Sequence, residues 1–148
     1  MSRSQRLNRI ADHVGHDQEA AARELGRVRG QLQEHEDQLQ QLRDYCLSYH
    51  TQLAEAQARG GSAAQMANYS RFLGRLTDAI RQQEQNVAAA TRAFEQQRQV
   101  WIQARARVEA VKKAADRCAT EEAQTEEKRE QRQNDDLNLT RRMRGNQT

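Results

Sequence analysis

The stretch that decides the fold is residues 25–56, LGRVRGQLQEHEDQLQQLRDYCLSYHTQLAEA. Its seam positions, nearly all apolar, recur at alternating intervals of three and four residues without a slip. This spacing defines a heptad repeat, abcdefg, whose a and d side chains form the contact seam of a coiled coil. The a positions are Leu25, Leu32, Leu39, Cys46 and Leu53, and the d positions are Val28, His35, Leu42, Tyr49 and Ala56. The seam continues more loosely back through Ala21, Val14, Ala11 and Leu7, and it predicts a helix over about residues 4–58.

A break in this pattern falls at Arg59-Gly60-Gly61-Ser62. Glycine adopts the left-handed backbone conformation that ends many helices, so this stretch predicts a turn over residues 59–62. Ser62 and Gln65 then have the spacing of a capping box, in which the Ser hydroxyl accepts from the Gln amide and the Gln side chain reaches back. A second helix is therefore expected to begin near residue 63.

The second helix carries a seam of its own. Its a positions are Met66, Leu73, Ile80, Val87, Phe94, Trp101, Val108 and Ala115, and its d positions are Tyr69, Leu76, Gln83, Ala90, Gln97, Ala104, Val111 and Cys118. Gln83, Gln97 and Ala104 leave the middle of the d column weak, which predicts a compliant region there.

Folding the chain at Gly61 sets each a residue of one helix against a d residue of the other, as an antiparallel coil requires. It pairs Leu73 with Tyr49, and it pairs Trp101, the largest side chain, with the small Ala21. Alternating large and small residues fill such a core without voids. We therefore predict an all-α fold, a long two-helix antiparallel coiled-coil hairpin, over residues 1–148.

The end of the second helix differs from the rest. Residues 63–118 are expected to be paired, residues 119–140 to form an unpaired polar extension, and residues 141–148 to be a flexible basic tail containing Arg141, Arg142 and Arg144. A helix without packing is marginal in water, so we expect this end to fray and to become ordered only on a partner.

Composition excludes several functional classes. Charged residues make up 30% of the 148 residues, aromatic residues only 4%, and there is no proline, which is typical of long helices. The net charge of +3 is scattered among many acids, whereas nucleic-acid binders concentrate basic residues on one face. No apolar run approaches the roughly 20 residues needed to span a bilayer, and no signal core follows the start. We expect a soluble cytoplasmic protein.

Motifs for catalysis or metal binding are missing from the sequence. It has no phosphate-binding loop, nucleophile elbow or HExxH motif, and a two-helix hairpin offers no concave pocket that excludes water. His13 and His16 share a helix face, but without a third ligand they are expected to be solvated. The sequence therefore predicts a protein that acts by binding, not an enzyme, with no cofactor and no metal.

Three seam residues are not ordinary apolar side chains. His35 is either a half-buried side chain that adjusts the packing or a pH-dependent weak point in the coil. Cys46 and Cys118 lie at opposite ends of the hairpin, where they cannot pair with each other and are expected to pack as small hydrophobic residues.

Tyr45 and Phe72 interrupt an otherwise polar or small column of g positions. The g positions of both helices line one side of an antiparallel coil, so these two rings join neighbouring d residues in what we term the tip stripe. The tip stripe consists of Gln38, Leu42, Tyr45, Tyr49, Phe72, Leu76 and Ala79. Large g residues can simply widen a core. Four of the five Tyr and Phe residues lie between 45 and 72, however, and clustered, partly exposed aromatic side chains favour a protein interface.

The end that holds both termini is expected to carry what we term the basic collar. It consists of Arg3, Arg6, Arg9, Arg105, Arg107, Lys112, Lys113 and Arg117. A solvated face is the usual explanation for such residues, and a docking site for a complementary ring or pore is the alternative.

The sequence on both sides of the turn resembles the FliJ family, soluble components of the flagellar type III protein export apparatus. The resemblance rests on Leu39-x2-Leu42-x2-Tyr45-x3-Tyr49 before the turn and on Asn68-Tyr69-x2-Phe72-Leu73-x2-Leu76-x2-Ala79-Ile80-x2-Gln83 after it. The length, the place of the turn and the long polar second helix also fit.

The resemblance implies a coiled-coil stalk similar to the central shaft of rotary ATPases, located in the cytoplasm at the base of the flagellum. Its partners would be the export ATPase ring, the cytoplasmic part of the export gate protein FlhA, and export chaperones. Carried over by residue, the tip stripe is the face for the gate. The end with both termini would enter the ATPase ring, and because no motif marks that end, the basic collar is assigned to it by its position alone. Family members often have a charged residue or His after the stripe where this sequence has Gln83, and no role is carried over to it.

Other functions stay open from the residues alone. The equivalent stalk of a virulence-type secretion system would differ in its genome neighbours. A generic homodimeric coiled-coil scaffold would sediment as a dimer and would not need the Gly60-Gly61 turn. A nucleic-acid binder would be retained on DNA in a salt-dependent way that weakens when Arg105 and Arg107 are neutralised.

Overall fold

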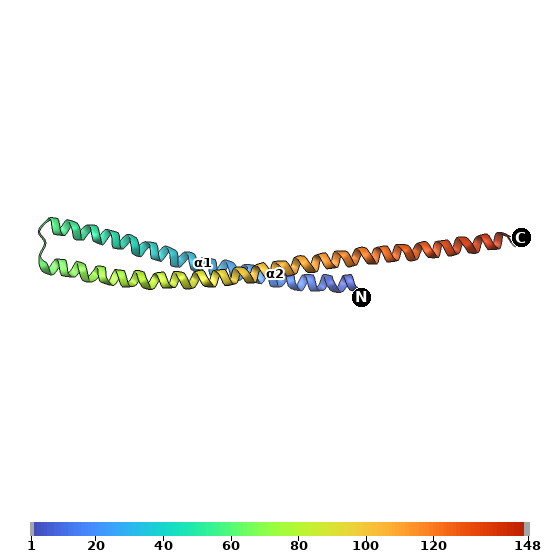
Figure 1. The fold of residues 1–148 in the computed structure, drawn as a ribbon, viewed down its shortest axis with the longest axis horizontal. Helices are drawn as coiled ribbons and strands as arrows, with labels where there is room; N and C mark the ends of the chain where they lie inside the picture. The colour runs from blue at the N-terminus through green and yellow to red at the C-terminus, as the bar shows by residue number, and fades with distance from the viewer. Residues whose placement is uncertain (1, 147–148) are drawn as a thin grey trace. The chain divides into compact units, whose positions relative to one another are not determined.

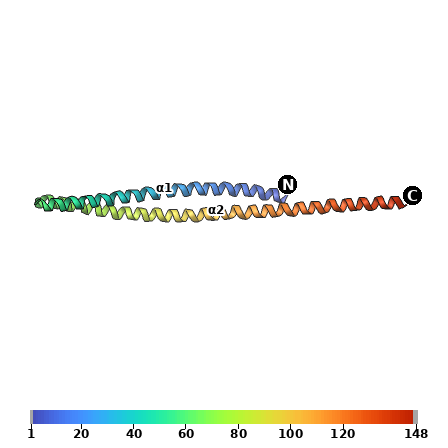
Figure 2. The same ribbon diagram turned by 90° about the horizontal axis from the view of Figure 1, so that it is seen from above.

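The computed structural model describes residues 2–146, and within them it contains two helices and no strand. Helix α1 spans Arg3–Ala58 and helix α2 spans Ala63–Asn146 (Figure 1). The helices run in opposite directions and pack against each other as a hairpin (Figures 1 and 2). The predicted all-α fold of two long helices is confirmed.

Contacts divide the described residues between two compact units. We term the first, Glu19–Ile102, the turn unit, because it contains the connection between the helices. The second, the terminal unit, combines the described parts of Met1–Gln18 and Gln103–Thr148.

Two glycines end α1 in the turn unit. Gly60 has a φ of 77°, the left-handed conformation that glycine adopts without strain. The amide of Gly60 donates to the carbonyl of Gln57, and the amide of Gly61 donates to the carbonyl of Ala56, the two bonds of a Schellman motif. A Cβ added to Gly61 would lie 3.1 Å from the carbonyl oxygen of Ala56, a tight approach to the backbone that also favours glycine there.

The start of α2 has the predicted capping box. The amide of Gln65 donates to Oγ of Ser62 over 3.2 Å, and the amide of Ser62 donates to Oε1 of Gln65 over 3.4 Å. These bonds satisfy amides that have no partner inside the helix. The turn is therefore set by local sequence on both sides.

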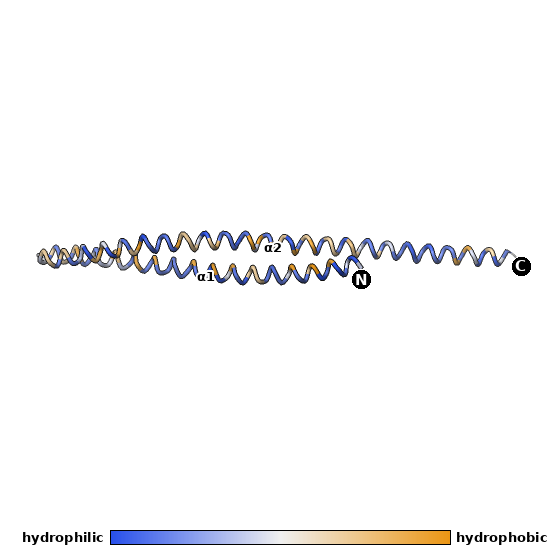
Figure 3. The backbone as a smooth tube through the Cα atoms, turned by 90° about the horizontal axis from the view of Figure 1, so that it is seen from below, coloured by the Kyte–Doolittle hydropathy of each residue, from blue (hydrophilic) through white to orange (hydrophobic). Residues whose placement is uncertain are grey.

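Burial follows the predicted seams. Every seam position of the turn unit, from Ala21 to Ala56 in α1 and from Met66 to Trp101 in α2, is buried or half-buried. In the terminal unit the core consists of Ala11, Ala104, Val108, Ala115 and Cys118. Figure 3 shows apolar residues recurring along both helices and a mostly hydrophilic end of α2.

The last part of α2 is helical but solvated. Every residue from Ala123 to Asn146 is exposed, as an unpaired extension would be. The helix continues through residues 141–146, where the sequence predicts a flexible tail. The segment holds no proline, so nothing forces a break in the helix there. Residues 147–148 of that tail lie outside the described residues. Fraying of the extension in solution stays a prediction.

Candidate functional site

Tyr49 is the centre of an aromatic cluster in the turn unit. Its ring stacks on Phe72 with centroids 4.1 Å apart and on Tyr45 at 6.2 Å. The ring of Tyr69 meets Tyr49 edge-on, also at 6.2 Å. The structure thus brings together all four aromatic residues that the sequence places on the two sides of the turn.

The members of the tip stripe differ in exposure. Tyr45 is 61% exposed, whereas Tyr49 and Phe72 are half-buried beneath and beside it. Leu76 is only 8% exposed and belongs to the core. Leu42 is half-buried, and Gln38 and Ala79 are exposed. Phe72 therefore widens the core, as the first interpretation has it, while Tyr45 presents its ring to solvent, and the interface interpretation stays a prediction.

Gln83 has a role that the sequence does not suggest. It is 8% exposed, and its Nε2 donates to the carbonyl of His35 over 2.9 Å and to Oε1 of Gln38 over 3.3 Å. Nδ1 of His35 lies 3.1 Å from the same nitrogen, and Nδ2 of Asn86 donates to Oε1 of Gln83. Buried polar atoms persist in native cores when they are bonded in this way. Gln83, which interrupts the apolar d column, is thus held by hydrogen bonds within a polar network.

His35 lies in this network, although folding the chain at Gly61 sets Val87, not Gln83, opposite it. The long Gln83 side chain reaches along the seam by about a turn, which a register of Cβ positions does not capture. The half-buried position of His35 fits a side chain that adjusts the packing.

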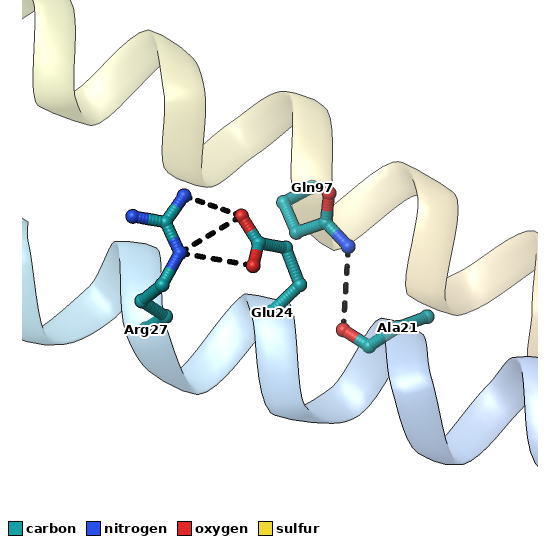
Figure 4. A network of polar contacts seen from close by, with 4 residues as sticks. All are labelled: Ala21, Glu24, Arg27 and Gln97. Carbon is teal, nitrogen blue, oxygen red and sulfur yellow. Dashed lines mark hydrogen bonds and ion pairs between the residues drawn. The ribbon is translucent and has the colours of Figure 1, made fainter.

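Gln97 is bonded in a similar manner. Its Nε2 donates to the carbonyl of Ala21 over 3.3 Å, next to the pair of Glu24 and Arg27 (Figure 4). Nε of Arg27 donates to both carboxylate oxygens of Glu24, over 3.0 and 2.9 Å. This hydrogen bonding lowers the pKa of Glu24 and raises the pKa of Arg27.

Two hollows flank the aromatic cluster. The larger, about 590 Å³, is lined by Gln38, Gln41, Leu42, Asp44, Tyr45 and Gln83. The smaller, about 310 Å³, is lined by Tyr49, Gln52, Asn68, Tyr69 and Phe72. Surface hollows beside an exposed ring can accept side chains of a partner. Gln41 and Asp44 line the larger hollow, and the heptad pattern gave no sign of them because they lie outside the a, d and g columns.

The basic collar is exposed throughout. All eight of its residues lie in the terminal unit, with their side chains in solvent. Nε of Arg105 lies 3.6 Å from Oε1 of Glu109 on the same helix. An exposed set of cations supplies positive charge to any acidic surface that approaches this unit.

A partly buried polar contact joins the two helices in the terminal unit. Oγ of Ser4 donates to Oε2 of Glu122 over 2.6 Å, and the Ser4 amide donates to Oε1 over 3.2 Å. Ser4 is 8% exposed. Bonds from Ser4, first its hydroxyl and then its amide, lower the pKa of the Glu122 carboxyl. Pairing therefore extends one turn past Cys118, the last residue that the sequence predicts to be paired.

Large apolar side chains are exposed near the end of α2. They lie beyond Ala115 and Cys118, where the predicted a and d columns of the second helix end. Leu139 and Met143 are 54% and 61% exposed, and Leu137 is 58% exposed. Leu139 continues the d column that contains Cys118, and Met143 continues the a column that contains Ala115. Continuing the same heptad count would have identified these two positions from the sequence.

The histidines and cysteines of the described residues form neither a metal site nor a disulfide. Nε2 of His13 lies 3.7 Å from Oδ2 of Asp17 at the surface. Cys46 is half-buried, Cys118 is buried, and both are free thiols. Across residues 2–146 no group of three His, Cys, Asp or Glu side chains could hold a metal ion, and no helix is long and apolar enough to cross a membrane.

The comparisons with known proteins agree with one another. The model of the family described as flagellar FliJ protein matches residues 3–147. The flagellar FliJ protein of Escherichia coli strain K12 is 28% identical over 131 residues, which cover 88% of this chain and 89% of that relative. No solved structure gives a significant match.

Proposed function

Because the chain belongs to the FliJ family of flagellar proteins, we propose that it is the coiled-coil stalk of the flagellar protein export apparatus. It binds the export ATPase ring with one end and the cytoplasmic part of the export gate protein FlhA with the other, and it escorts export chaperones. It works by binding and not by catalysis, in the cytoplasm at the base of the flagellum, in contact with a membrane complex but not inserted in the bilayer.

The aromatic cluster is the observation that carries the gate contact. Tyr45 exposes 61% of its surface, yet its ring is held in place by stacking on Tyr49, which in turn stacks on Phe72. A ring that is already ordered loses little conformational entropy when a partner covers it. Ordered, exposed tyrosines are frequent hot spots of protein interfaces.

Charge supports the contact with the ATPase ring. The exposed basic collar can meet acidic residues of a ring, and the exposed Leu139 and Met143 offer apolar side chains in the same phase as the seam. A partner that covers this extension would supply the packing that the lone helix lacks.

The generic scaffold is the less favoured function. It does not require the Schellman turn that joins α1 to α2, whereas a single-chain stalk does. The flagellar name of the curated relative favours the flagellar system over the virulence-type one.

A capture experiment tests the proposal. Wild-type protein is immobilised and offered separately the flagellar export ATPase, the cytoplasmic part of FlhA and the export chaperones. A variant with both Tyr45→Ala and Phe72→Ala should lose the gate alone. Leu47→Ala is the matched control, because Leu47 is a large apolar side chain on the same helix, 67% exposed, outside the tip stripe.

The outcomes separate the functions. Capture of the ATPase and the gate by wild type, with gate binding lost only in the double variant, supports the stalk and its gate-facing side. A folded wild type that captures none of the partners would leave a hairpin without the proposed role. Sedimentation as a dimer with equal behaviour of all variants would favour the scaffold.

A further inference from the structure

We infer that the hollow beside Tyr45 receives a basic side chain, arginine or lysine, of the gate partner, and that Asp44 selects for it. This inference rests on the proposed function, because it specifies the chemistry of the partner at the same surface. It adds Asp44, which lies outside the tip stripe, as a specificity-determining residue.

The hollow beside Tyr45 combines apolar surface with a single acidic side chain. Leu42 is half-buried and Tyr45 exposes its ring, so both offer carbon surface. Gln38, Gln41 and Gln83 contribute uncharged amides, and Asp44 is the one charged residue of the lining. Gln38 and Tyr45 lie one heptad apart on α1, so their side chains flank the space between them.

The charge of Asp44 is not neutralised within the hairpin. Nε2 of Gln40 donates to its Oδ1 over 2.9 Å, an uncharged partner. The positions one turn away on α1, residues 40, 41, 47 and 48, hold no basic residue. The adjacent Arg43 instead has its Nη2 3.8 Å from Oε1 of Glu84. Among residues 2–146 Asp44 forms no ion pair, so its carboxylate is available to a cation from outside.

A long basic side chain fits this combination better than other side chains. Its methylene stem can lie on Leu42 and Tyr45 while its cationic head reaches the Asp44 carboxylate. A cation over the Tyr45 ring gains a further attraction. An acidic side chain would meet the like charge of Asp44, and a purely apolar one would take water from the carboxylate without replacing it.

Asp37 provides a matched control on the same helix. It is one heptad before Asp44, it is exposed, and Nε2 of Gln33 donates to its Oδ1 over 2.9 Å as Gln40 does for Asp44. Asp37 does not line the hollow. The two acids therefore share a local environment and differ in their place relative to Tyr45.

The test measures the affinity of the full-length chain for the cytoplasmic part of FlhA by titration calorimetry at two salt concentrations. Asp44→Asn should weaken binding roughly two- to fivefold, as for a partly exposed ion pair. Asp44→Lys should weaken it by roughly tenfold or more, because like charges then meet, and the loss should shrink at high salt. Asp37→Lys should bind as wild type does.

Each outcome decides the inference. A selective loss with Asp44→Lys supports it, and equal binding by the Asp44→Lys and Asp37→Lys variants, whether both strong or both weak, overturns it. The variant with Tyr45→Ala and Phe72→Ala tests the proposed function separately. If that variant loses the gate while Asp44→Lys keeps it, the stalk function stands and only the basic occupant is wrong. If wild type does not bind the gate, both fail.

Discussion

Replacement of Gln83 by leucine tests how the hairpin holds a polar side chain in its seam. Gln83 is 8% exposed and donates to the His35 carbonyl over 2.9 Å. That carbonyl lies inside α1, where it also accepts a helical amide, so losing the Gln83 bond does not leave it without a partner. Gln38 is exposed and can turn to water. The substitution therefore removes hydrogen bonds without leaving an isolated buried charge.

The expected gain in stability is small but measurable. Burial of a leucine side chain contributes about 1.5–3 kcal/mol, and each hydrogen bond lost costs about 1 kcal/mol net. With the bond to the His35 carbonyl, the shortest contact of Gln83, counted as lost, and with the half-buried or exposed side chains of His35, Gln38 and Asn86 turned to water, Gln83→Leu should stabilise the folded state by about 1 kcal/mol. For a chain of this size that raises the melting temperature by roughly 3 °C.

Thermal unfolding followed by circular dichroism measures this shift. Gln85→Leu is the control, since Gln85 is exposed on the same helix and should leave the melting temperature within about 1 °C. Gln97→Leu should add a second, similar increase, because the two sites are far apart along the seam. A melting temperature that is unchanged or lower in the Gln83→Leu variant would refute the reasoning, and would show that the polar network stabilises the seam more than apolar packing would.

Three further predictions follow from the turn, the terminal unit and the extension. Gly60→Ala, at a φ of 77°, should destabilise by about 1 kcal/mol in urea titrations, whereas Gly74→Ala, where an added Cβ meets nothing within 4 Å, should stabilise by about 0.5–1 kcal/mol. Changes of the same sign would contradict the turn geometry. The Ser4 bonds lower the pKa of Glu122 from its ordinary value of 4.5. Their contribution to the stability of the folded state is therefore complete above pH 4.5 and is lost as the pH falls through the folded-state pKa. The melting temperature should therefore fall more steeply with decreasing pH in wild type than in the Ser4→Ala variant. If the two proteins lost melting temperature equally as the pH fell, the Ser4–Glu122 bonds would not contribute to stability. Deletion of residues 123–148 should change the melting temperature by no more than about 2 °C, because the described part, 123–146, is exposed, but should weaken capture of the export ATPase. A large fall in melting temperature would show that the extension packs in solution.

The candidate site was partly readable in the sequence. The heptad count places Tyr45 and Phe72 on one side of the coil, and the structure brings both rings onto Tyr49. The count treats Leu76 as a member of the same stripe, yet it is buried in the core. Asp44 lies at a heptad position that faces away from the seam, so periodicity alone drew no attention to it.

What the sequence by itself determined is the helical hairpin and its turn. Heptad spacing, the Gly60-Gly61 pair and the Ser62–Gln65 capping box act through neighbours in the chain, so local geometry settles them. The family resemblance around the turn also came from the residues alone.

Only the tertiary structure decided which polar residues are satisfied and which rings are exposed. Gln83 and Glu122 are polar residues at positions where the heptad pattern expects apolar ones. Each is hydrogen-bonded to the opposite helix, which the pattern does not show. A long side chain reaches its partner across the seam, and whether it does depends on the stagger of the two helices to within a fraction of a turn. Heptad spacing specifies which face meets the partner helix, and the stagger then decides which atoms meet.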